Sequence, residues 1–177
     1  MTNLLQTWHD EHATFSRLLS VLEQQVNGFH AGEDPSYELM LDIVDYLRHY
    51  ADQFHHPRED AAFARLLRRS PELKPQINRL VQEHRVIATA GEDLLSRLRE
   101  IIVGAVQPKA AVETAAATYL IYYRHHIATE ERDLLPRAQA LLDAGDWAAV
   151  DNAVPGGSDP LHTARYAALR REIASLG

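Results

Sequence analysis

Apolar residues recur at steps of three and four along four stretches of this 177-residue chain, and no other feature limits its fold as strongly. This spacing places apolar side chains on one face of an α-helix. It predicts helices over residues 4–26, 34–67, 77–102 and 108–142, and nothing in the sequence resembles a strand-and-turn array. Four long helices joined by short links favour an all-α fold, built as an antiparallel up-down-up-down four-helix bundle.

Glycine and proline mark the ends of these helices. The segment Gly28 to Gly32 should end the first, and Asp34-Pro35 offers a capping acid and a first-turn proline to the second. Ser70-Pro71 separates the second from the third, which stops near Gly104. We expect a short helical turn over 146–150, a flexible connector over 154–158 and an amphipathic helix over 159–176. The chain thus divides into a bundle over residues 1–145 and a C-terminal helical extension over 146–177, packed on the outside of the bundle.

Composition excludes several classes of function. The chain has no cysteine, which rules out disulfides, thiolate metal sites, iron–sulfur clusters and thiol catalysis. Its net charge is −7 and its arginines are spread along the chain, so we expect no nucleic-acid partner. No stretch reaches the roughly 18 apolar residues of a spanning helix, and the amino terminus lacks a basic leader, so we expect a cytoplasmic protein without a membrane partner. The ten histidines stand out, because neutral imidazole suits iron, zinc, copper and nickel.

Two segments repeat one arrangement of a histidine and a glutamate four residues apart, His55 with Glu59 and His126 with Glu130. Residues at this spacing share a helix face, so both side chains can reach one metal centre. The first and third helices carry a second repeat, Glu11-His12 and Glu83-His84. The offsets between the copies are 71 and 72 residues, which indicates two similar helical hairpins related by a pseudo-two-fold axis.

The four repeated histidines should lie at one depth in the bundle. His12 and His55 are each some 20 residues from the first loop, and His84 and His126 are similarly placed about Val106. Four imidazoles and two carboxylates buried together would be unfavourable without a cation, since a buried unpaired charge costs several kcal/mol. Two ions fit better than one, because carboxylates can bridge them and leave positions for water or a substrate.

The ordered pattern of these residues resembles the H, HxxxE, H, HxxxE signature of hemerythrin-like proteins, also called HHE cation-binding domains, over about residues 5–140. The resemblance implies a four-helix bundle around a non-haem di-iron centre with an oxo or hydroxo bridge. It implies as metal ligands the nitrogens of four histidines and the bridging carboxylates of two glutamates: His12, His55, Glu59, His84, His126 and Glu130. Nitrogen and oxygen ligands also admit zinc or manganese.

One departure from the oxygen-carrying members of the family is informative. Their third helix carries two histidines four residues apart, whereas Ala88 stands four residues after His84 here. With fewer nitrogen ligands the irons should be more open to water and peroxide. The resemblance therefore favours an iron protein that binds dioxygen or peroxide, with a peroxide-removing or redox-sensing role, over reversible oxygen storage.

Two other functions are left open, and so is whether the protein is an enzyme. One is a non-catalytic regulatory module that senses iron or zinc, and the other is an interaction bundle without metal. The interaction bundle would keep its fold after replacement of His84 and His126 by alanine, without any change in metal content. It is an alternative because a single buried histidine is more often a hydrogen-bonded core residue than a ligand. A homodimer is also left open.

Several residues near the pattern have two interpretations. Tyr119 and Tyr123 either pack in the core or hydrogen-bond a bridging oxygen, and Asp60 and Glu131 either orient ligand histidines or face solvent. Pro57 can kink the second helix and so disturb the spacing of His55 and Glu59. The remaining histidines are expected to be structural or exposed, with the two that adjoin His55 and His126 as alternative ligands: His9, His30, His49, His56, His125 and His162.

Overall fold

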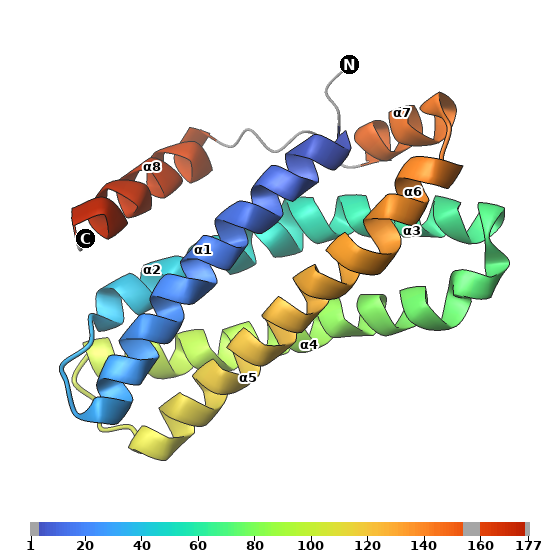
Figure 1. Ribbon diagram of the computed structural model, residues 1–177. Coiled ribbons are helices and arrows are strands. Elements are labelled where there is room, and N and C mark those ends of the chain that lie inside the picture. The colour runs from blue at the N-terminus through green and yellow to red at the C-terminus, as the bar shows by residue number, and fades with distance from the viewer. Residues whose placement is uncertain (1–3, 154–159, 176–177) are drawn as a thin grey trace.

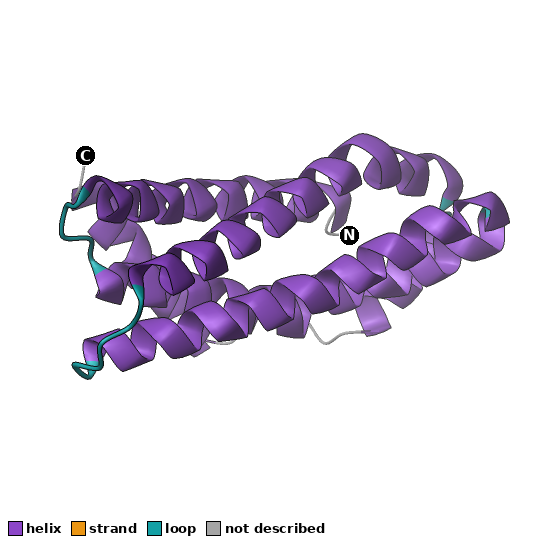
Figure 2. Cartoon of the chain, turned by 90° about the horizontal axis from the view of Figure 1, so that it is seen from below, coloured by secondary structure: helices purple, strands orange, loops and turns teal. Residues whose placement is uncertain are grey.

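A computed structural model of the chain describes residues 4–153 and 160–175, and all regular elements in these two ranges are helical (Figures 1 and 2). The predicted all-α class is thereby confirmed. Two π-helical turns and one 3-10 turn interrupt the α-helices. In chain order the elements are α1 Leu4–Ala31, α2 Tyr37–Tyr50, the π turn η1 Ala51–His55, α3 His56–Arg69, the 3-10 turn η2 Pro71–Leu73, α4 Lys74–Ile102, α5 Lys109–Thr129, the π turn η3 Glu130–Leu134, α6 Leu135–Leu141, α7 Ala144–Ala153 and α8 Pro160–Ser175.

These elements form four long rods, because η1 joins α2 to α3 and η3 joins α5 to α6 without a break in the helical path. The rod α1 packs against α2 and α5, and the rod α4 packs against the same two helices. At the other end of the molecule, α3 contacts α4 and α6. The two C-terminal helices lie on the outside of these rods, with α7 against α3 and α8 against α2 (Figure 1).

The ends of α1 and α4 are built alike and lie at the same end of the molecule (Figure 1). Gly32 and Gly104 follow these helices with φ of 85° and 87°, a region that residues with a Cβ atom rarely adopt. The amide after each glycine bonds back five residues, from Glu33 to Gly28 and from Ala105 to Glu100, at 2.9 Å in both cases. Each helix thus ends in a Schellman motif, and the repeated end agrees with the internal repeat of the sequence.

A layer of polar residues divides the buried core into two apolar clusters. The larger cluster contains Phe15 to Leu22 of α1 and Ile87 to Leu98 of α4, with matching residues of α2 and α5. The smaller cluster contains Leu4 to Trp8 of α1 and Leu73 to Leu80 of η2 and α4. His12 and His84 fall between these stretches in sequence. The apolar clusters therefore border the polar layer on both sides along the rods.

Some helix boundaries differ from the prediction. The helix α1 continues through Gly28 to Ala31, since one glycine inside a well-packed helix costs only about 1 kcal/mol. The second helix is capped by Ser36 and not by Asp34, because the Ser36 Oγ accepts the amide hydrogen of Leu39 at 3.2 Å. The expected connector over 154–158 lies outside the described residues. Within the described ranges, no helix combines the length and apolarity that crossing a membrane requires.

Candidate metal centre

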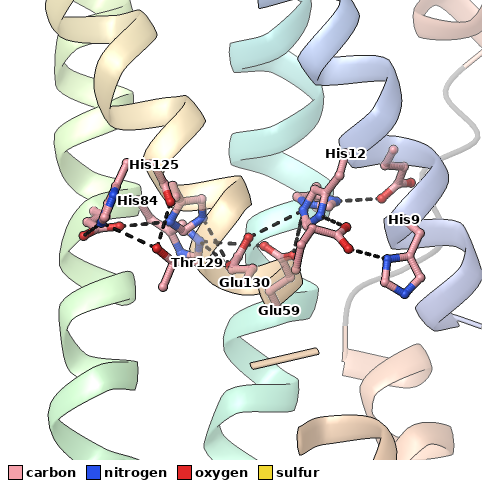
Figure 3. Close-up of polar contacts among 12 residues, drawn as sticks. His9, His12, Glu59, His84, His125, Thr129 and Glu130 are labelled. Carbon is pink, nitrogen blue, oxygen red and sulfur yellow. Dashed lines mark hydrogen bonds and ion pairs between the residues drawn. The ribbon is translucent and has the colours of Figure 1, made fainter. Parts of the chain in front are cut away.

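Six side chains predicted from the sequence meet in the polar layer. The histidines lie on α1, at the end of η1, on α4 and on α5, while Glu59 follows on α3 and Glu130 begins η3. All are buried, and both glutamates are completely enclosed. Figure 3 shows Glu59 and Glu130 between His84 on one side and His12 on the other. The six residues brought together are His12, His55, Glu59, His84, His126 and Glu130.

Glu59 faces two groups of imidazoles, one with each carboxylate oxygen. Its Oε1 lies 3.1 Å from Nε2 of His55 and 3.3 Å from Nε2 of His12. Its Oε2 lies 3.7 Å from Nε2 of His84. A carboxylate that directs its two oxygens to different sets of nitrogens can bridge two cations, one in each set.

Glu130 repeats this arrangement from the other hairpin. Its Oε2 lies 3.5 Å from Nε2 of His12, while its Oε1 lies 3.2 Å from Nε2 of His126 and 3.8 Å from Nε2 of His84. The layer therefore has two halves that share both glutamates. His12 and His55 form the first half, and His84 and His126 form the second.

A second carboxylate faces the outer nitrogen of each of these four imidazoles. The contacts of His12 and His55 are hydrogen bonds, which fix the ring so that Nε2 points inward, the usual arrangement around a metal-bound histidine. Those of His84 and His126 are ion-pair contacts without hydrogen-bond geometry. Asp60 and Glu131, which had two interpretations from sequence, both occupy this position. The Nδ1 contacts are His12 to Glu131 at 2.7 Å, His55 to Glu11 at 2.6 Å, His84 to Asp60 at 3.1 Å and His126 to Glu83 at 3.5 Å.

These outer contacts follow the internal repeat. His84 and Glu83 lie 72 residues after His12 and Glu11, and the pair of Asp60 with His84 corresponds to the pair of Glu131 with His12. In the sequence, Glu11 and Glu83 stand out only as neighbours of the candidate histidines. The structure shows that each contacts a histidine of another helix, His55 or His126. The repeat of a Glu-His pair was the signal from which this role could have been inferred.

His56 is an additional buried imidazole in the second half of the layer. One donor atom from each of His56, Glu59, His84 and His126 lies within 4.8 Å of the others. Its ring stacks on that of His84 with centroids 4.1 Å apart. From its place beside His55, His56 is an alternative ligand to that residue, but the structure buries both in the layer. The second half of the layer therefore contains a third buried imidazole, on a different helix from His84 and His126.

The π turn η1 explains how two consecutive histidines can both be buried. The amide of His56 bonds to the carbonyl of Ala51, five residues back, instead of four. Pro57 has no amide hydrogen for the carbonyl of Gln53, which removes one α-type bond at this point. A π turn accommodates one extra residue and is frequent at functional sites. In place of the kink expected at Pro57, the structure has a π turn, and Glu59 still lies beside His55.

The buried glutamates determine the charge of the surrounding imidazoles. Burial by itself would lower the pKa of His12, but the hydrogen bond with Glu131 and the nearby negative charge of Glu59 raise it to about 10. The pKa of His84 rises to about 9 against the effect of burial through Asp60 and Glu130, and that of His126 to about 9 through Glu130. In the metal-free protein, protons on these rings supply the positive charge that the two glutamates require.

His56 behaves in the opposite way. Burial and the neighbouring positive charge of His84 lower the pKa of His56 well below 6.5, so this ring stays neutral at pH 7. A neutral imidazole binds a metal ion without first losing a proton. Burial would raise the pKa of Glu59, but His55 and His12 hold it well below its usual value.

The atoms that lack hydrogen bonds in the layer indicate a cation. Among the described residues, neither carboxylate oxygen of Glu59 or Glu130 has a hydrogen-bond partner, nor does Nε2 of His84 or His126. Buried polar atoms are almost always satisfied, so each exception asks for an explanation such as an ion. Metal ions between the two halves would satisfy all of these atoms at once. With nitrogen and oxygen donors only, the site suits iron, manganese or zinc.

Apart from His56, the other described histidines lie outside the buried layer. The His9 ring contacts Glu131 at 2.6 Å, His30 contacts Glu113 at 3.1 Å, and both histidines are exposed. The His125 side chain is 48% exposed, which excludes it from the buried layer. His49 lies 3.3 Å from Gln53 and outside both groups of donor atoms. The side chain of His162 lies outside the described residues.

Tyr119 and Tyr123 are buried in the larger apolar cluster, as the core interpretation predicted. Their hydroxyl groups have no hydrogen-bond partner within the described ranges. The hydrogen bond from one of them to a bridging oxygen stays a prediction.

The comparison with protein families identifies one match. The profile described as "Hemerythrin HHE cation binding domain" matches residues 3–138, which includes every residue of the polar layer. Neither the curated proteins nor the solved structures contain a match to this chain.

Proposed function

The chain belongs to the hemerythrin HHE cation-binding domain family, and on this premise we propose that it holds two iron ions and reacts with peroxide. The observation that carries the proposal is the division of each buried glutamate between two groups of imidazoles, with Oε1 of Glu59 toward His55 and Oε2 toward His84. Two bridging carboxylates flanked by imidazoles suit a pair of ions better than one. The packing of α1 and of α4 against both α2 and α5 supports the antiparallel four-helix bundle that is expected for this family.

Each ion would have its own nitrogen donors. His12 and His55 would bind the first ion, and His84 and His126 the second, with Glu59 and Glu130 bridging. His56 adds a nitrogen donor to the second half only. Iron at this position would supply electrons and a Lewis acid for reactions of peroxide. The surrounding carboxylates Glu11, Asp60, Glu83 and Glu131 would hold the imidazoles in place and keep Nε2 directed at the ions.

A small reactant fits this site better than a large one. The layer is enclosed by apolar residues on both sides, and its glutamates are completely buried. Six or seven protein donors leave free positions on a pair of ions, which a molecule of the size of dioxygen or hydrogen peroxide can occupy. The cytoplasmic location, the division of the chain at residue 145 and the homodimer stay predictions.

The test compares the chain loaded with iron and the same chain loaded with zinc. Both ions suit the donors, but only iron changes its oxidation state. We expect the iron-loaded protein to remove many equivalents of hydrogen peroxide and the zinc-loaded protein to remove none. An iron-loaded protein that leaves peroxide intact would contradict the peroxide reaction and favour the non-catalytic metal-sensing module.

A further inference from the structure

A row of three tyrosines connects the surface at α8 with α2. The rings of Tyr46 and Tyr50 stack with centroids 6.2 Å apart and an interplanar angle of 10°. Tyr166 of α8 stacks on Tyr46 with centroids 5.0 Å apart. Tyr46 is buried, while Tyr166 is partly exposed. The row thus runs from the solvent-facing helix α8 into the bundle.

The inner end of the row is linked to the polar layer. The Tyr50 hydroxyl donates a hydrogen bond to Oε1 of Glu11, and Oε2 of Glu11 lies 2.6 Å from Nδ1 of His55. Phe15 fills the space beside this link, with its ring centroid 5.0 Å from that of His55. Only one carboxylate and one imidazole therefore separate the Tyr50 hydroxyl from the proposed ions.

A cavity of about 330 Å³ runs along the row between α1, α2 and α8. Its lining includes Glu11, Thr14, Tyr46, Tyr50 and Tyr166. Burial raises the pKa of Tyr46 and of Tyr50, so both are neutral phenols at rest. The cavity gives solvent a route to the outer part of the row.

The second hairpin has no such row. Residue 121, which lies 71 positions after Tyr50, is an isoleucine that is 67% exposed. Glu83 occupies the position of Glu11 in the repeat, and its Oε1 accepts a hydrogen bond from Arg79 instead of a tyrosine. The repeat thus preserves the carboxylate that orients the imidazole, while the tyrosine contact exists on one side only. Holding His55 in place does not by itself explain the tyrosine row.

Tyr123 is close to the layer, with its ring 6.1 Å from that of His56, but no described carboxylate accepts a hydrogen bond from its hydroxyl. Its hydroxyl and that of Tyr119 have no hydrogen-bond partner among the described residues. Removing an electron from a phenol makes its proton strongly acidic, so oxidation is favoured where a carboxylate can take the proton. Tyr50 with Glu11 meets this condition, and the two buried tyrosines do not.

We propose that Tyr166, Tyr46, Tyr50 and Glu11 form a redox relay between the surface at α8 and the metal centre. The relay rests on the proposed function, because hydrogen peroxide acting at the iron centre is the oxidant. Tyr50 gives one electron to the centre, its O–H bond breaks, and the proton passes to Glu11. An electron then moves from Tyr166 through Tyr46 to Tyr50, which recovers its proton from Glu11, while Tyr166 releases its own proton to solvent.

The electrons and atoms balance over two such events. Two electrons arrive at the centre from the row, and two protons are released to solvent. One hydrogen peroxide molecule takes up two electrons and two protons, its O–O bond breaks, and two water molecules form. Each event leaves one neutral radical on Tyr166. Before the next event, a one-electron donor of the ascorbate or phenol class at the surface of α8 gives it one electron, and solvent returns one proton, so that Tyr166 is tyrosine again.

The test mixes iron-loaded full-length protein with hydrogen peroxide and records electron paramagnetic resonance spectra of samples frozen within the first seconds. We expect a tyrosyl radical signal in the unaltered protein, loss of most of it in Tyr50→Phe, and a changed signal in Tyr166→Phe. Iron content is measured in each variant, so that a lost signal is not a consequence of lost metal. Mass spectrometry then locates oxidised or cross-linked tyrosines, which should be those of the row.

Tyr122→Phe serves as the matched control, because it removes a surface tyrosine of α5 outside the row. It should keep the radical signal. A signal that persists in Tyr50→Phe, or no signal while peroxide is consumed, would overturn the relay alone. Failure to bind iron or to consume peroxide would overturn the proposed function and the relay together.

Discussion

Oε1 of Glu131 lies 2.7 Å from Nδ1 of His12, although 119 residues separate them in sequence. The contact joins the end of one hairpin to the beginning of the other and directs Nε2 of His12 toward Glu59 and Glu130. The same arrangement recurs between Asp60 and His84 at 3.1 Å. The centre thus depends on carboxylates that do not themselves belong to the proposed ligands.

Replacing Glu131 by glutamine should weaken metal binding without removing a ligand. An amide orients the His12 ring less firmly and supplies no negative charge, and loss of such a partner typically lowers metal affinity about 10–100-fold. Competition with a chelator of known affinity measures the change. Asp133→Asn is the control, because Asp133 pairs with the neighbouring Arg132 outside the layer. Equal affinities of Glu131→Gln and the unaltered protein would contradict this role.

The stability of the metal-free protein should fall as the pH rises from about 6.5 to about 9. The pKa values of His12, His84 and His126 are raised to about 10, 9 and 9 in the folded chain, above the value of about 6.5 in an unfolded chain. The folded state therefore binds more protons in this interval, and the stabilisation is complete below pH 6.5 and is lost through the folded pKa values. Urea unfolding at several pH values measures the trend.

The metal-loaded protein provides the internal control for this trend. Metal binding requires neutral imidazoles, so binding releases protons and becomes stronger as the pH rises over the same interval. The stability gained by adding metal should therefore increase with pH. A gain that is constant between about pH 6.5 and 9 would show that these histidines do not exchange protons for metal.

His56→Ala should affect one of the two ions. The neutral His56 ring belongs to the second group of donors with Glu59, His84 and His126, and it is not a member of the first group. We expect the metal content to fall from about two ions per chain toward one. The control is His125→Ala, which removes an exposed imidazole of α5. Two tightly bound ions in His56→Ala would exclude this residue as a ligand.

Phe15→Ala should destabilise the fold next to the polar layer. Phe15 is 1% exposed and packs against His55, Tyr50 and Tyr123. Loss of a buried phenyl ring typically costs about 3–5 kcal/mol. Urea unfolding of the metal-free protein measures this cost against Val106→Ala, a loop residue that is 96% exposed and should change stability by less than about 0.5 kcal/mol. A cost below about 1 kcal/mol for Phe15→Ala would mean that the site relaxes around the lost ring.

The helices and the meeting of six candidate residues were predictable from sequence for a simple reason. Helical periodicity fixes which residues share a face, so His126 and Glu130 had to lie together, and their closest atoms are 3.2 Å apart. The repeat offsets then placed the equivalent residues of the other hairpin at the same depth. The metal-ligand role of these residues stays a prediction.

Two features of the centre depend on information that periodicity does not contain. The contact of Glu11 with His55 depends on the rotation of α1 relative to α2 and α3, which follows from the packing of the whole core. The burial of His56 depends on the π turn η1, since a regular α-helix would not direct two consecutive residues into one layer. The sequence signalled the first only by a repeated Glu-His pair and the second only by Pro57.

The central claim is that the polar layer binds two iron ions, and metal analysis of a matched pair of variants tests it most directly. The untagged protein, His126→Ala and His125→Ala are purified in parallel and analysed by plasma mass spectrometry, with circular dichroism to verify the fold. We predict about two irons per chain in the unaltered protein and in His125→Ala, and a clear loss in His126→Ala. Zinc alone, or a metal content that His126→Ala leaves unchanged, would contradict the di-iron centre.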